Sequence, residues 1–206
     1  MFDPYILIAL LVVVTIHECA HAVTSNALGD PTAKLAGRIS LNPFAHLDPM
    51  GVIMLLLIHI GWGKPVPVND HYFANPKRDT TLTALAGPFS NLMLALILAI
   101  PLKYFNQFLH PILEHFLKTV FDISIVLFAF NMLPFPPLDG SKIIGIFIPN
   151  QFQLAYQRYL RSSMLYFFLF LLFDQFVLGQ IFNVSILQMF IGNIYTWINA
   201  AIFLGT

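Results

Sequence analysis

The sequence predicts an all-α polytopic membrane protein, and three observations support this fold class. Hydrophobic residues make up 58% of the 206 residues, charged residues make up only 10%, and the mean hydropathy is +0.77. A soluble domain has about 25% charged residues, so a water-soluble globule is excluded. Ten Lys and Arg balance ten Asp and Glu without forming a basic run, which argues against a nucleic-acid partner. The single Cys excludes an internal disulfide and a four-cysteine zinc cluster.

Apolar segments along the chain predict five transmembrane helices, at residues 5–28, 82–105, 111–133, 163–178 and 181–204. A sixth would be present if residues 51–62 crossed the bilayer, but this run of 12 is short and is expected to be re-entrant. Residues 37–43 and 63–69 carry Gly, Pro and Asn among alternating apolar residues, which predicts short β-strands between the first two spans. We expect a single domain over residues 1–206, with a core at 5–145 and C-terminal helices at 163–204.

The first span contains the sequence His17-Glu18-Cys19-Ala20-His21, an H-E-x-x-H motif. On a helix the two histidines share one face, where they can bind one metal ion, and Glu18 lies close enough to act on a metal-bound water. Zinc suits this ligand set and leaves one coordination position open. The alternative is a pair of buried histidines bonded to helix backbone. Ionisable groups inside a span favour a functional role.

Two histidines leave zinc short of a third protein ligand, and Asp139 is the strongest candidate. It follows Asn131, Pro134, Pro136 and Pro137 at the end of the third predicted span, where the prolines prevent the helix from continuing. A carboxylate on such a break can face a neighbouring helix. The alternative is an ordinary Pro-Leu-Asp-Gly surface turn. Asp30, Asp48 and Asp174 are weaker candidates.

The H-E-x-x-H motif and the later N-x-x-P-x-x-x-L-D-G motif together resemble the site-2 proteases, a family of intramembrane zinc metalloproteases. The stretches at 37–51, 63–69 and 86–91 resemble the short prokaryotic branch of that family. The resemblance covers residues 10–145 and implies that one zinc ion is held by His17, His21 and Asp139, with Glu18 as the general base. The family often carries a PDZ-type or CBS-type regulatory domain, and we expect this chain to hold neither.

Four further polar residues are weaker site candidates. Asn91 and Asn131 could hydrogen-bond an oxyanion or orient a ligand, although Asn91 could equally be an amide that packs between helices. His46 and Asp48 could lie near the active site or hold a second metal. A solvated loop pair is the favoured reading for these two.

These predictions lead to an intramembrane endopeptidase that hydrolyses peptide bonds in or near transmembrane segments, using zinc-activated water and a glutamate base. A metal-ion transporter and a non-catalytic membrane scaffold are the alternatives. The expected partners are a transmembrane protein substrate and the lipid bilayer. With five spans, eight of the ten Lys and Arg would lie in the cytoplasm, which places the N-terminus outside and the active site toward the cytoplasmic half of a prokaryotic cell membrane.

Overall fold

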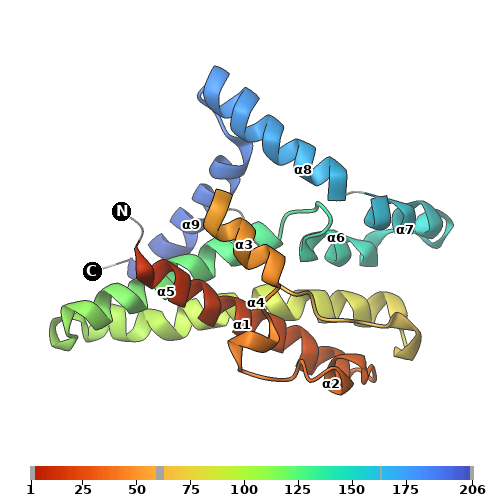
Figure 1. Cartoon of the computed structure of the whole chain (residues 1–206), viewed down its shortest axis with the longest axis horizontal. Helices are drawn as coiled ribbons and strands as arrows, with labels where there is room; N and C mark the ends of the chain where they lie inside the picture. The colour runs from red at the N-terminus through yellow and green to blue at the C-terminus, as the bar shows by residue number, and fades with distance from the viewer. Residues whose placement is uncertain (1–2, 59–62, 163, 205–206) are drawn as a thin grey trace.

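A computed structural model describes residues 3–58, 63–162 and 164–204, and in this part of the chain helices joined by loops make up the fold (Figure 1). Its α-helices are α1 (Pro4–Ala27), α2 (Thr32–Leu35), α3 (Pro49–Ile58), α4 (Pro76–Tyr104), α5 (Pro111–Asn131), α6 (Asp139–Ile144), α7 (Gln153–Ser162), α8 (Met164–Leu172) and α9 (Ile186–Phe203). Short 3₁₀ helices join them at Pro43–Ala45, Asp70–Tyr72, Asn106–Phe108, Gly145–Phe147 and Asn150–Phe152, and a π-helix follows α8 at Phe173–Gly179.

Helix α1 has clear signals at both of its ends. Asp3 accepts a hydrogen bond from the Tyr5 backbone N–H at 2.9 Å, and Pro4 occupies the first turn, where its missing N–H costs nothing. Beyond the last turn Gly29 adopts a φ of 110°, which a residue with a side chain rarely tolerates. The 24 residues between these signals span about 36 Å, enough to cross a bilayer.

Helices α1, α4 and α5 lie side by side and form the core layer of the molecule (Figure 1). Buried Ala9 and Val13 of α1 pack against Val120 of α5. Ala95 and Ala99 of α4 pack in the same way against α5, on the side that α9 covers. Such small residues let helix backbones approach closely, which is how helices associate without a hydrophobic driving force.

Helix α9 is attached to this layer by polar contacts as well as by packing. The Tyr195 hydroxyl donates to Asp122 of α5 at 2.7 Å, and Lys103 of α4 donates to the Ile202 carbonyl at 2.8 Å. Phe121 and Phe203 meet edge to face with ring centroids 5.7 Å apart. Helix α8 points away from the layer (Figure 1).

The predicted number of spans is wrong. Within the described residues three helices are long and apolar enough to cross a membrane, namely α1, α4 and α9. A fourth is reached if the bent stretch of residues 150–160 and 165–179 counts as one span. Helix α5, predicted as a span, has 21 residues but carries Glu114, Lys118 and Asp122. The run at 51–62 begins within α3, and its residues 59–62 lie outside the described part of the chain.

The predicted β-strands at 37–43 and 63–69 are also wrong. The described residues hold only an isolated bridge between Leu47 and Gly63. In the second stretch the Lys64 N–H donates to the His46 carbonyl at 2.8 Å, and side chains bind several of the other backbone groups. Glu18 accepts from the Val66 N–H, and Asp30 accepts from the Asn69 N–H. Pro65 and Pro67 have no N–H to offer a ladder.

The segment that leads to Asp139 is held from behind by helix α7. The Tyr156 hydroxyl donates to the Ser141 carbonyl at 2.5 Å, and the Tyr159 hydroxyl donates to the Pro134 carbonyl at 3.1 Å. These two carbonyls lie on either side of Asp139 in the chain. The chain beyond residue 150 therefore supports the loop between α5 and α6.

Candidate metal centre

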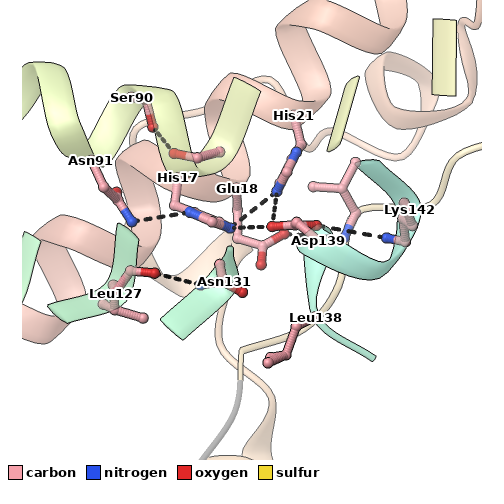
Figure 2. Close-up of polar contacts among 12 residues, drawn as sticks. His17, Glu18, His21, Ser90, Asn91, Leu127, Asn131, Leu138, Asp139 and Lys142 are labelled. Atoms are coloured by element: carbon pink, nitrogen blue, oxygen red, sulfur yellow. Dashed lines mark hydrogen bonds and ion pairs between the residues drawn. The ribbon is translucent and has the colours of Figure 1, made fainter. Parts of the chain in front are cut away.

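His17, His21 and Asp139 converge on one point, although 118 residues separate His21 from Asp139 (Figure 2). His17 Nε2 and His21 Nε2 lie 3.1 and 3.2 Å from Asp139 Oδ2, and the two nitrogen atoms lie 3.0 Å apart. Ligand atoms at about 2.05 Å from a tetrahedral zinc ion would be about 3.3 Å from one another. Two imidazoles and a carboxylate at this spacing fit a zinc site, and all three side chains are buried.

Three elements bring these ligands together. Helix α1 places the two histidines one turn apart, with ring centroids separated by 4.6 Å. Helix α6 begins at Asp139, directly after the proline-rich loop. Helix α4 covers the site with Gly87, and a Cβ atom there would lie 2.3 Å from His21 Nε2 and 2.6 Å from His17 Nε2. Glycine at this position allows the helix to approach the imidazoles.

The other ring nitrogen of each histidine also has a partner. His21 Nδ1 lies 2.7 Å from the Thr83 carbonyl, so it donates its proton there and leaves Nε2 free to bind a metal. His17 Nδ1 lies 3.1 Å from the Asn91 side-chain amide, which is fully buried. Both histidines are therefore oriented by residues of helix α4.

Asp139 directs its two oxygen atoms to different groups. Oδ2 faces the imidazoles, whereas Oδ1 lies 3.8 Å from the Lys142 ammonium one turn along α6. Burial works to raise the pKa of the Asp139 carboxyl, but His21 and His17 together lower the pKa by more. An ionised carboxylate is the form of this side chain that binds a metal.

Glu18 lies at the edge of the same group and lines a cavity of about 440 Å³ together with the three ligands (Figure 2). Its Oε2 atom accepts a hydrogen bond from the Val66 N–H at 3.1 Å. Val66 and Val68 form one wall of the cavity, and Asn131 and Lys142 lie elsewhere on its lining. The cavity therefore offers a base, metal ligands and an apolar wall.

The weaker candidates are distributed differently. The Asn131 amide donates to the Leu127 carbonyl at 3.0 Å and borders the cavity. His46 is buried, and its Nε2 donates to the Ser40 carbonyl at 2.8 Å. Asp48 accepts from the Gly51 N–H at the start of α3. Neither His46 nor Asp48 is among the described residues that line the cavity.

Two of the rejected metal ligands have structural partners. Asp30 binds Thr32 and the Asn69 backbone, and Asp174 accepts from the Ser185 hydroxyl and the Ile186 N–H at the start of α9. Sequence reasoning missed Gly87, Thr83 and Arg38, which contact the histidines or Glu18. Gly87 lies in the 86–91 stretch that carries the family resemblance, but that stretch alone did not indicate a contact with the histidines.

A helix-borne His-Glu-x-x-His motif completed by a buried aspartate, in a chain with several membrane-spanning helices, defines a membrane metalloprotease. Comparison with known proteins agrees with this class. Residues 100–173 match the model of Peptidase family M50. The "Putative zinc metalloprotease YwhC" of Bacillus subtilis is 43% identical over 153 residues, which cover 71% of this chain and 70% of that protein. The chain belongs to peptidase family M50, the site-2 protease family, and is a zinc metalloprotease.

More distant relatives carry the same kind of name. The "Putative zinc metalloprotease Rip2" of Mycobacterium tuberculosis is 32% identical over 136 residues, and that of Mycolicibacterium smegmatis is 30% identical over 131 residues. These matches cover 63% and 61% of this chain, and the chain spans about half the length of either relative. No solved structure matches the chain significantly.

Proposed function

We propose that this protein is an intramembrane endopeptidase that cuts other membrane proteins in or near their transmembrane segments. The observation that carries the proposal is the position of His17 and His21, which lie on α1, a helix long and apolar enough to span the bilayer. A metal centre built on such a helix meets substrates that reach the same depth. The cavity beside it is open to a peptide segment and has an apolar wall at Val66 and Val68.

His17, His21 and Asp139 would hold the zinc ion, which polarises a water molecule and a peptide carbonyl when it is bound. Glu18 is the base that takes a proton from the attacking water. The resulting carboxylic acid then gives that proton to the amine that leaves. Asn131 borders the cavity and is a candidate to hydrogen-bond the substrate.

Asn91 has a separate role in this proposal, which is to fix the proton on His17. A metal bound at Nε2 requires the proton on Nδ1, and this proton needs an acceptor. The Asn91 amide lies 3.1 Å from Nδ1, and its buried Oδ1 atom has no hydrogen-bond partner in the described part of the chain. With Oδ1 turned toward Nδ1, Asn91 would accept a hydrogen bond from the Nδ1–H group, and both atoms would be satisfied.

The substrate must present its peptide bond in an unwound form. A helical segment shields its carbonyl groups in its own hydrogen bonds, so a transmembrane helix has to open locally before Glu18 and the metal can reach it.

We infer that the site faces the cytoplasmic half of the membrane. The segment between α1 and the apolar part of α4 carries five of the ten Lys and Arg, at positions 34, 38, 64, 77 and 78.

Substitution of Glu18 by Gln tests the proposal in cells. New peptide termini in the membrane fraction are compared between cells that express the wild type and cells that express Glu18→Gln. The proposal expects termini within or next to transmembrane segments in the wild type only, with zinc content unchanged in the purified variant. Equal termini in both strains would show that Glu18 is not the base.

A further inference from the structure

Arg38 is a buried cation beside the catalytic site. It lies after the short helix α2, and only 4% of its surface is exposed. Its guanidinium donates to two consecutive carbonyl groups, that of Lys64 and that of Pro65, the second at 3.0 Å. These residues begin the extended segment whose Val66 and Val68 form a wall of the active-site cavity. Arg38 therefore ties its loop to that wall.

The same guanidinium also faces the catalytic base. Arg38 Nη2 lies 4.0 Å from Glu18 Oε2, the oxygen that accepts the Val66 N–H at 3.1 Å. One carboxylate oxygen is thus held by a backbone donor and a cation. The other oxygen, Oε1, has no hydrogen-bond partner within residues 3–58, 63–162 and 164–204. A Cβ added at Gly63 would lie 3.9 Å from Oε1, which is an ordinary van der Waals contact.

We propose that Arg38 is a positioning residue for Glu18: with Val66 it holds Oε2, so that Oε1 is the atom that takes the proton from water. This proposal rests on the proposed function, because it assigns an atom to the base of that reaction. A buried guanidinium needs a counter-charge, and the Glu18 carboxylate supplies it. The cation in turn keeps the Glu18 carboxylate at a fixed place beside the metal ligands.

The alternative is that Arg38 has a structural role alone and only anchors the cavity wall formed by Val66 and Val68. Asp30 separates the two roles, because it anchors the other end of the same wall. Its Oδ2 accepts from the Asn69 N–H at 2.8 Å, and no contact joins it to Glu18 among the described residues. The Asp30→Asn variant is therefore the matched control for loss of a wall anchor.

The test measures binding of acetohydroxamic acid to the full-length protein in detergent, with Co²⁺ replacing zinc so that visible absorption reports the metal site. A hydroxamic acid binds a metal as its anion, and a nearby carboxylate that takes up the released proton favours this binding over release of the proton to solvent. Binding therefore depends on the position of Glu18 without any substrate. The Glu18→Gln variant gives the reference value for the affinity for acetohydroxamic acid without the carboxylate. Metal content is measured for each variant.

Arg38→Met is expected to keep its metal and to bind acetohydroxamic acid about 100-fold more weakly, because misplacing a catalytic group by about 1 Å has this size of effect. Arg38→Lys keeps the cation but cannot bind both carbonyls, so an intermediate loss is expected. Asp30→Asn should bind within about threefold of the wild type. If Arg38→Met does not fold, Arg38→Lys decides, and wild-type affinity in that variant overturns the proposal.

Equal weakening in Asp30→Asn and Arg38→Met would also overturn the proposal, since it would show a wall effect alone. Cleavage is measured separately on the same proteins. A wild type that binds acetohydroxamic acid but produces no new termini in cells would refute the proposed function, while the comparison of the Arg38 variants would still stand. If the wild type produces new termini and the Arg38 variants bind acetohydroxamic acid as tightly as the wild type, the role of Arg38 is refuted and the proposed function still stands.

Discussion

Gly87 permits helix α4 to contact both imidazoles of the candidate metal centre, and the Gly87→Ala variant tests this contact. The added Cβ would lie 2.3 Å from His21 Nε2, whereas ordinary contacts of a Cβ begin at 3.4 Å. Helix α4 and the histidines must therefore separate by about 1 Å, a displacement that costs about 100-fold where it misplaces a reacting group. Thr83 and Asn91 would move with the helix, and loss of such orienting partners lowers metal affinity by about 10–100-fold.

Zinc affinity is measured by competition with a chelating dye, and the free energy of unfolding is measured on the zinc-free protein. Overpacking is expected to lower that free energy by about 1–3 kcal/mol, partly offset by the gain of about 0.5–1 kcal/mol when Ala replaces Gly in a helix. Gly192→Ala in α9 is the control, because no atom lies within 4 Å of its added Cβ. Unchanged zinc affinity in Gly87→Ala would refute the assignment of this glycine.

Three further outcomes are expected. Asp139→Asn should lower zinc affinity by at least about 100-fold, measured by the same dye competition; wild-type affinity would remove Asp139 from the ligand set. Tyr195→Phe should lower the free energy of unfolding by about 1.5 kcal/mol, because its hydroxyl donates to the Asp122 carboxylate, and an unchanged thermal midpoint would show that this bond does not hold α9. The hydrogen bond from His115 and that from the Tyr5 N–H lower the pKa of Asp3 below 3.8, so the cap on α1 is intact above that pH and is lost as the pH falls through the lower, folded-state pKa. Thermal unfolding between pH 5 and pH 3 should therefore show a smaller decline for Asp3→Asn than for the wild type.

The first helix and the site that it carries were predictable because both depend on local sequence. An apolar run with Asp3 and Pro4 at its start predicts a helix, and histidines at positions i and i+4 share a face on any helix. The contact of the two histidines with Asp139 was harder to predict, because it joins residues more than a hundred positions apart. It was predicted because the prolines before Asp139 break the helix and because two histidines leave zinc under-coordinated.

The extended segment at 63–69 shows why the β-strand prediction was wrong. Its alternating pattern predicted a strand, and the described residues show none there beyond the isolated bridge at Gly63. The pattern did not reveal that Glu18, Asp30 and Arg38 would bind its N–H and carbonyl groups, which are otherwise free to pair with a strand. Contacts of this kind depend on the tertiary fold and leave no periodic signal in the sequence.

The number of spans was overestimated for a different reason. Sequence windows accepted the third segment as a span although it contains Glu114, Lys118 and Asp122. In the structure this helix has protein neighbours along its length, with α1 and α4 on one side and α9 on another. Hydropathy alone does not distinguish a helix covered by other helices from one that faces lipid.

Through Tyr156 and Tyr159, the C-terminal part of the chain contacts the loop that carries Asp139 of the candidate metal centre. Their hydroxyl groups donate to the carbonyls of Ser141 and Pro134, which lie on either side of Asp139 in the chain, although the amphipathic helix that carries them contributes no candidate ligand among the described residues. A protein cut after residue 150 would keep every catalytic side chain and lose the support behind one of them. The loop that carries Asp139 would then lack the two hydrogen bonds that α7 supplies.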